Sequence, residues 1–152
     1  MSTPERVAWL QGCGAHLREV LAEWDRGALA PVPVGHAWEV VRMEKHLGWR
    51  TVQRLQTVGA GVGPVLLTGT HMGFLVPVGT AASWKAPNTG VLADGDFLSA
   101  PDPAVVAPLT NRCRTWVIAP DSYVSLNDPA ALLEAYLAAW KDDQRKTREA
   151  KR

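Results

Sequence analysis

The sequence is poor in cysteine and in long apolar runs, and each shortage excludes a class of protein. Its two cysteines, Cys13 and Cys113, lie far apart and form no CxxC pair. A zinc site or a disulfide framework is therefore not expected, and both thiols are predicted to be reduced. No apolar run approaches the roughly 20 residues of a membrane span, so no membrane partner is expected. The N-terminus lacks a basic segment followed by an apolar core, which predicts a cytoplasmic location.

A strong charge of either sign is also missing, because the net charge is +1. This excludes a protein that binds nucleic acid through bulk charge alone, and it leaves a local basic groove open. The 152 residues are 47% hydrophobic and 20% charged, which is enough for one folded domain over residues 1–152. Eleven arginines against five lysines, with a single isoleucine, are typical of a GC-rich, actinomycete-like genome.

Helix and strand patterns alternate in the first half of the chain. Pro4, at the expected first helical position, and the helical spacing of the apolar residues after it predict a helix over residues 4–26, interrupted near Gly12. Prolines in residues 28–38 predict an extended connector, and residues 37–43 alternate as a strand. The next helix ends at the glycines of residues 59–63, and its expected apolar stripe consists of Leu47, Val52, Leu55 and Val58.

Short β-like runs bounded by glycine or proline fill the second half. They cover residues 64–69, 72–78, 89–94, 96–101 and 115–120, with a short helix expected between the second and third runs. A last helix is capped by Asn127 or Asp128, has Pro129 in its first turn, and ends in a frayed, solvated tail. Its expected apolar face consists of Leu132, Leu133, Tyr136, Leu137 and Trp140. Strands in the middle with helices outside predict an α+β fold with a central, mostly antiparallel sheet.

Three segments carry a family resemblance: "VGHAWEVVRMEKHLGWRTVQRL", "GPVLLTGTHMGFLVPVGTAASWKAPNTGVLADGDFLSAP" and "RTWVIAPD". In this order they resemble small actinobacterial proteins related to the N-terminal domain of bifunctional DNA primase/polymerases. The resemblance covers residues 33–121. The shared features are Trp38, Gly63-Pro64, the Phe74-Leu75-Val76-Pro77 run, Gly79-Thr80-Ala81, Trp84, Ala100-Pro101 and Trp116.

That resemblance implies an RRM-like sheet of the archaeo-eukaryotic primase superfamily over residues 33–121. A helical segment (1–30) would precede it, and a C-terminal helix (127–152) would follow. Active members of the superfamily hold divalent metal with an Asp-x-Asp pair and a third carboxylate, and they grip the nucleotide phosphates with a Ser-x-His motif. Two-metal catalysis needs carboxylates that fix the cations about 4 Å apart.

The chain departs from this pattern at the chemically decisive positions. No Asp-x-Asp precedes His71, and the histidine follows Thr68 and Thr70 rather than a Ser-x-His serine. Asp94 and Asp96 come after it, flanking a glycine in a predicted hairpin turn. The resemblance is therefore to a catalytically degenerate member, and Mg²⁺ or Mn²⁺ would be needed only if catalysis remains.

Each candidate residue has a functional and a structural interpretation. His71, with Thr70 beside it, is either a catalytic or phosphate-gripping residue or a polar residue at the start of a strand. Asp94 and Asp96 are either metal ligands or ordinary turn residues. A third candidate set would bind nucleotide or nucleic acid or else form a solvated helix face; it consists of Lys45, Trp49, Arg50 and Arg54.

Three functional hypotheses follow. The first is a non-catalytic primase/polymerase-like accessory module that binds a nucleotide or single-stranded nucleic acid. The second is a regulatory adaptor that contacts a protein partner through its terminal helices. The third is an active nucleotide-handling enzyme with relocated acids. A nucleophilic hydrolase and a P-loop are not supported, because neither G-x-S-x-G nor Gly-Lys-Ser/Thr occurs.

Overall fold

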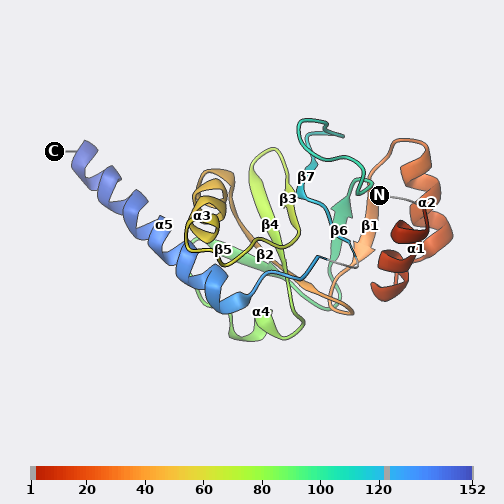
Figure 1. Cartoon of the computed structure of the whole chain (residues 1–152), viewed down its shortest axis with the longest axis horizontal. Coiled ribbons are helices and arrows are strands. Elements are labelled where there is room, and N and C mark those ends of the chain that lie inside the picture. The colour runs from red at the N-terminus through yellow and green to blue at the C-terminus, as the bar shows by residue number, and fades with distance from the viewer. Residues whose placement is uncertain (1–2, 122–123, 152) are drawn as a thin grey trace.

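A computed structural model describes residues 3–121 and 124–151 and shows an α+β fold, as predicted. In chain order the elements are α1 (Thr3–Gly12), α2 (Leu17–Asp25), β1 (Ala30–Pro33), β2 (Glu39–Glu44), α3 (Lys45–Thr57), β3 (Val65–Leu67), β4 (His71–Val76), α4 (Thr80–Ser83), β5 (Thr89–Leu92), β6 (Phe97–Ala100), β7 (Thr115–Ile118) and α5 (Pro129–Ala150) (Figure 1).

The main sheet has five strands in the order β5-β2-β4-β3-β7. Every neighbouring pair in it is antiparallel, which confirms the predicted sheet type. The long central strands β2 and β4 pair over their whole length, from Glu39 opposite Val76 to Glu44 opposite His71. None of the helices in the described part of the chain has the length and apolar character that a bilayer span requires.

A second, two-stranded sheet was not predicted. β1 lies within the residues expected to be an extended connector, and it pairs antiparallel with β6. Pro31 and Pro33 are compatible with this position because β1 is an edge strand, where a missing N–H leaves no central ladder bond unmade. The hairpin expected around Asp94 and Asp96 is also wrong, since β5 belongs to the main sheet and β6 to the small one.

The expected interruption of the N-terminal helix is confirmed. α1 ends at Gly12, and Gly14 has a left-handed φ of 71° before α2 begins at Leu17. A glycine takes this conformation without the steric penalty of a Cβ. The break lets α1 and α2 fold back on each other at one end of the molecule (Figure 1).

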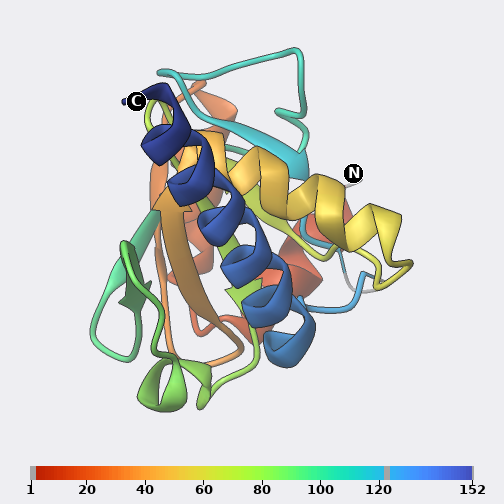
Figure 2. The same cartoon turned by 90° about the vertical axis from the view of Figure 1, so that its left-hand side faces the viewer.

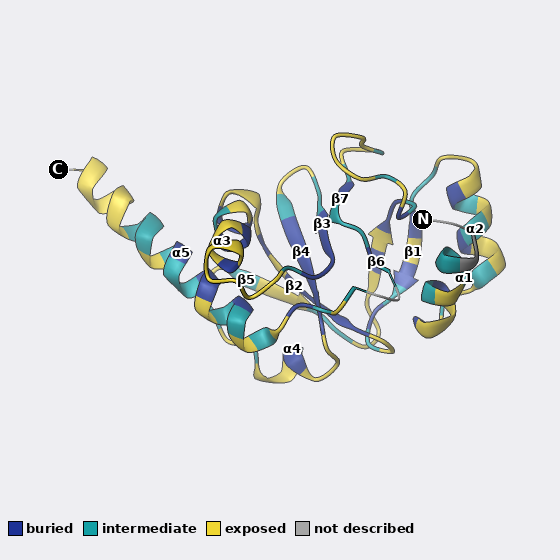
Figure 3. Ribbon diagram, in the orientation of Figure 1, coloured by how far each residue is buried: buried dark blue, intermediate teal, exposed yellow. Residues whose placement is uncertain are grey.

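Both faces of the main sheet are buried, and successive side chains along its strands belong alternately to two separate hydrophobic clusters. Val40 and Leu75 belong to the cluster that faces α1, α2 and the small sheet. Val41 and Phe74 belong to the cluster that faces α3 and α5. Figure 2 shows α3 and α5 together over this second face, and Figure 3 shows the buried centre of the sheet between the two layers.

Two predictions about the helices need correction. Val58 does not complete the apolar stripe of α3; it lies just past the helix end and is 57% exposed. The C-terminal tail is a regular part of α5 to Ala150 rather than the predicted frayed end, although its side chains from Arg145 onward are exposed to solvent as predicted. This final part of α5 extends beyond the rest of the molecule (Figure 3).

Asp128 is the cap of α5, and Asn127 has a different role. The Asp128 carboxylate accepts a hydrogen bond from the Ala131 N–H at 3.1 Å, and Pro129 follows in the first turn. The buried Asn127 side chain accepts from the Gly63 N–H at 2.8 Å. It also donates to the carbonyls of Pro64 and Leu75, at 3.0 Å each. Asn127 therefore joins the start of α5 to β3 and β4.

Candidate anion-binding sites

A pocket of about 250 Å³ lies on the sheet face away from α3 and α5. It brings together side chains from β2, β3, β4, β5, β6 and the turn before β7. The lining residues are Arg42, Leu66, Thr68, Thr70, His71, Gly73, Leu92, Phe97, Leu98 and Arg114. His71 and Thr70, both candidates from the sequence, are among them.

Two glycines make room for this pocket. In the register of the sheet, Arg42 on β2 lies between Gly90 on β5 and Gly73 on β4. A residue without a side chain leaves the pleated surface open on either side of the arginine. A Cβ on Gly73 would lie 3.1 Å from Val40 Cγ1, so a larger residue would both crowd the strand and fill the hollow. The two glycines therefore leave open space on the sheet surface beside the Arg42 side chain.

Arg114 supplies a second cation from the opposite edge. The turn that presents it contains two non-glycine residues with left-handed φ, Arg112 at 50° and Cys113 at 66°. Such backbone conformations cost free energy and are concentrated at functional sites. Burial, and then the positive charge of Arg42, hold the pKa of the Arg114 guanidinium below its ordinary value. Arg114 nevertheless remains a cation at neutral pH.

The two arginines have no acidic partner in this environment. The lining residues include no aspartate or glutamate. Among the residues that the structure describes, neither arginine forms an ion pair. Two neighbouring guanidinium groups repel each other, and a partly buried one also loses hydration. An anion bound between them would relieve both costs.

Hydrogen bonds orient His71 at the edge of the pocket. The Thr68 hydroxyl accepts from the His71 N–H at 3.0 Å, and Thr70 Oγ1 lies 2.7 Å from His71 Nδ1. When the Thr70 hydroxyl donates to Nδ1, the neutral ring carries its proton on Nε2. His71 can then donate a further hydrogen bond from Nε2 to an anionic oxygen.

Phe97 adds an exposed aromatic ring to the rim. Its exposed fraction is 60%, and it lines both the sheet pocket and a second hollow of about 450 Å³ beside α2 and β1. Exposed aromatic rings provide stacking surfaces for bases. The pocket therefore combines cations, a histidine donor and a stacking surface.

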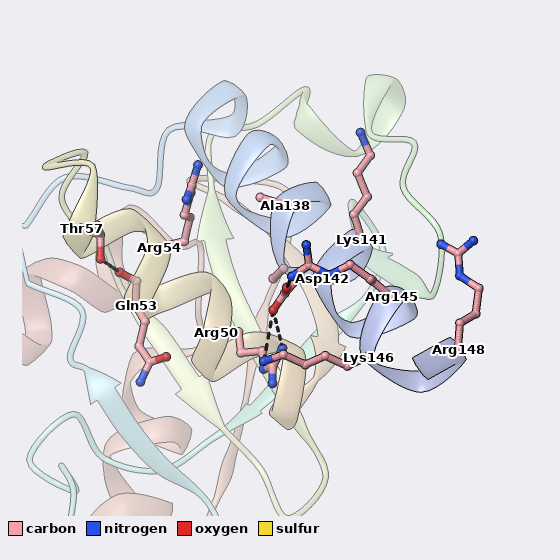
Figure 4. Close-up of a pocket in the computed structure, with 11 residues that line it drawn as sticks. Arg50, Gln53, Arg54, Thr57, Ala138, Lys141, Asp142, Arg145, Lys146 and Arg148 are labelled. Atoms are coloured by element: carbon pink, nitrogen blue, oxygen red, sulfur yellow. Dashed lines mark hydrogen bonds and ion pairs between the residues drawn. The ribbon is translucent and has the colours of Figure 1, made fainter. Parts of the chain in front are cut away.

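A larger groove of about 900 Å³ lies between α3 and α5. It is lined from α3 by Arg50, Gln53, Arg54 and Thr57, and from α5 by Ala138, Ala139, Lys141, Asp142, Arg145, Lys146 and Arg148. Figure 4 shows Arg50, Arg145 and Lys146 around Asp142, with Arg54, Lys141 and Arg148 farther from it. This groove belongs to the opposite layer of the molecule from the sheet pocket.

The nucleotide-binding residues expected from the sequence divide between the two sites. Thr70 and His71 line the sheet pocket, whereas Arg50 and Arg54 line the groove. Lys45 lines neither site, although its backbone N–H donates to the Thr70 carbonyl at 3.0 Å. Trp49 also lines neither site and is 40% exposed. The candidates do not form one cluster.

The acidic candidates lie outside both sites. Asp94 and Asp96 are exposed in the segment between β5 and β6, where Asp96 Oδ2 accepts from the Ala93 N–H at 2.9 Å. Glu44 is the register partner of His71 but does not line the pocket. The pKa of Tyr136 is raised, first by burial and then by the negative charges of Glu44 and Asp143. Across residues 3–121 and 124–151, no group of three or more His, Cys, Asp or Glu side chains is placed to hold a metal ion.

The sequence offered only one clear signal for the residues that were missed. Arg42 lies between the buried Val41 and Met43 of a central strand, and a charged side chain in such a place needs a partner or a ligand. Arg114 and Phe97 reach the pocket through a turn and through a strand of the other sheet. No local pattern predicts either placement. Comparisons of the chain with protein-family models, with curated proteins and with solved structures each find no match.

Proposed function

We propose that the protein is a non-catalytic accessory module that binds the phosphate groups of a nucleotide in the sheet pocket. The observation that carries the proposal is the pair of cations, Arg42 and Arg114, facing a hollow with no carboxylate lining. Guanidinium groups bind phosphate oxygens through paired hydrogen bonds, and such charge-assisted bonds are among the strongest in proteins. The resemblance of residues 33–121 to primase/polymerase-like modules favours the same class of ligand.

The other lining residues fit the remaining parts of a nucleotide. His71 Nε2 would donate to a phosphate oxygen, and the exposed ring of Phe97 would stack on a base. Stacking of this kind contributes about 1–3 kcal/mol per base. A hollow of about 250 Å³ suits the phosphates, with the base held outside on Phe97. No catalytic step is assigned, because the lining offers no carboxylate for a divalent cation.

Titration of the protein with ATP, adenosine and inorganic triphosphate, followed by calorimetry, tests this proposal. ATP is expected to bind and adenosine to bind far more weakly. Arg42→Gln and Arg114→Gln should each weaken ATP binding by about 10–100-fold, since each removes charge-assisted hydrogen bonds worth about 1.5–3 kcal/mol. Phe97→Ala should weaken ATP binding and leave triphosphate binding unchanged.

Arg54→Gln is the matched control, because it removes the same charge from the groove in the other layer. It should bind ATP as the unmodified protein does. Circular dichroism of each variant checks that the fold is retained. No ATP binding at millimolar concentration, or equal binding by the Arg42 and Arg114 variants, would overturn the proposal.

The adaptor hypothesis has one observation in its favour. The hollow beside α2 and β1 exposes apolar surface from Leu29, Pro31 and Phe97 next to the second helix of the N-terminal segment. If a protein partner binds there, Pro31→Asp and Phe97→Asp should each abolish its binding. Val78→Asp, which changes an exposed valine elsewhere, should leave that binding unchanged. Retention by all three variants would contradict the adaptor hypothesis.

A further inference from the structure

The groove between α3 and α5 is built from two helical stripes. Arg50, Arg54 and Thr57 recur at helical spacing on α3, and Lys141, Arg145 and Arg148 do so on α5. Residues three or four apart lie on one face of a helix, so each stripe presents its side chains to the same side. The small residues Ala138 and Ala139 also line the groove and leave its interior open.

The charge of the groove is far more one-sided than that of the chain. Six of its lining residues are cationic and one is acidic, whereas the whole protein has a net charge of only +1. Positive charge is thus gathered here rather than spread over the surface. A concave surface of one sign raises the local concentration of ligands of the opposite sign.

Asp142 marks the place where an anion is stabilised in this groove. Its carboxylate pairs with Arg50 at 3.1 Å and with Lys146 at 3.4 Å, and also with Arg145 (Figure 4). Burial opposes its ionisation. The hydrogen bond and charge of Lys146, with the charges of Arg145 and Arg50, nevertheless hold the pKa of Asp142 below its ordinary value.

Three cations of the groove are left without an acidic partner in the described part of the chain. These are Arg54, Lys141 and Arg148. They lie along both walls, so a bound polyanion could contact them in succession. Lys141 and Arg148 are seven residues apart on α5, or about 10 Å along the helix axis. That distance matches the axial rise of about three phosphates of one nucleic-acid strand.

The lining favours a double-stranded over a single-stranded polyanion. Surfaces that bind single strands combine cations with aromatic rings on which unpaired bases stack. The residues that line this groove include no aromatic side chain and no apolar one larger than alanine. They offer charge and hydrogen bonds, which suit phosphates, and nothing for an exposed base or a lipid chain.

We propose that the groove between α3 and α5 binds the sugar–phosphate backbone of duplex nucleic acid without reading its sequence. This site goes beyond the nucleotide pocket, from which it is separated by the main sheet, so either proposal can fail without the other. If the cations of the groove neutralise about four to six phosphates, the duplex affinity should depend steeply on salt concentration. Affinity should fall by about 10²–10³-fold between about 50 mM and 200 mM salt.

Fluorescence anisotropy with a labelled duplex of about 25 base pairs, and with one of its strands alone, tests the proposal at both salt concentrations. The unmodified protein should bind the duplex more tightly than the single strand. A variant with Arg54→Gln, Lys141→Gln and Arg148→Gln should lose most of the affinity, and its salt dependence should be about half as steep. Two duplexes of unrelated sequence should bind equally.

A second triple variant is the matched control. Arg18→Gln, Arg26→Gln and Lys85→Gln remove the same charges from exposed residues outside the groove. This variant should retain the duplex affinity. Asp142→Asn should raise the affinity several-fold, because it removes the one anion that competes with phosphate. A residue that only supported the fold would not produce a gain.

Three results would overturn the proposal. They are equal loss of affinity in both triple variants, single-strand binding as tight as duplex binding, and binding of anionic phosphatidylserine vesicles in preference to the duplex. Circular dichroism and the ATP titration of each variant show whether its fold and its sheet pocket are intact.

Discussion

Cys13 shows how burial sets the chemistry of a single residue. Its thiol is fully buried, and the sulfur accepts a hydrogen bond from Trp38 Nε1 at 3.2 Å. Burial raises the pKa of Cys13 from 9.0 to about 11, and the hydrogen bond offsets only part of the rise. Because nucleophilic reactivity requires the thiolate, Cys13 behaves as a small apolar residue, while the exposed Cys113 is open to reagents.

This raised pKa predicts a loss of stability in alkaline solution. The folded protein keeps the Cys13 proton more tightly than the unfolded chain, so the stabilisation is fully present below pH 9.0 and is lost as the pH rises toward about 11. The loss attributable to this residue should be about 2–3 kcal/mol. Urea unfolding of the protein and of Cys13→Ala at neutral and alkaline pH measures it.

The comparison with Cys13→Ala isolates this one group. Tyr136 also has a raised pKa and contributes to the alkaline loss in both proteins. Cys13→Ala should begin less stable at neutral pH, because it leaves a cavity, and should then lose less stability on raising the pH. Parallel stability curves for the two proteins would contradict the assignment.

At the scale of elements, α3 is held close to β4 by the absence of one side chain. A Cβ on Gly48 would lie 2.4 Å from Met72 Sδ and 2.9 Å from its Cβ and Cγ. The helix can therefore approach the strand only with glycine at this position. α3 also packs against α5 to form the basic groove.

Gly48→Ala is expected to destabilise the protein, against the usual helix preference for alanine. Replacing glycine within a helix normally gains about 1 kcal/mol. Here overpacking against Met72 should outweigh that gain and give a net loss of about 1–3 kcal/mol. Gly12→Ala is the matched control, since a Cβ at this helical glycine meets no atom within 4 Å. Thermal unfolding should show a loss for the first variant and none for the second.

At the scale of the whole molecule, one sheet separates two buried clusters. Trp24, Trp38 and Trp116 belong to the cluster on the α1–α2 side, and Trp9 packs against it. α3 and α5, which hold much of the helix, pack on the other side. Tryptophan fluorescence therefore follows both layers, because Trp84 and Trp140 pack against the second cluster, whereas helical circular dichroism follows mainly the α3–α5 layer.

Because both clusters share β2, β3 and β4, the molecule is expected to unfold in one cooperative transition. Fluorescence and far-ultraviolet circular dichroism should give the same denaturation midpoint. Tyr136→Phe removes a hydrogen bond to the Pro87 carbonyl on the α5 side. It should lower both midpoints equally, by an amount equivalent to about 1 kcal/mol. Separate midpoints, or a shift of only one, would show that the layers unfold independently.

The sequence alone determined the features that depend on neighbouring residues. Pro129 marks the start of α5, and the spacing of Leu47, Val52 and Leu55 identifies the buried face of α3. These signals are local because a helix satisfies its backbone hydrogen bonds within a few residues. His71 was likewise recognised as a candidate from its immediate context, and Arg50 and Arg54 from the surface of one helix.

Tertiary structure alone decided which distant residues meet. The pairing of β1 with β6, and the separation of β5 from β6, depend on strand partners far apart in the chain. The sheet register sets Arg42 between two glycines, and the turn at Arg112 and Cys113 carries Arg114 to the same hollow. Folding also places α5 beside α3, which turns two separate basic stripes into one groove. A ligand site needs several groups converging on one point, and only the folded chain provides that convergence.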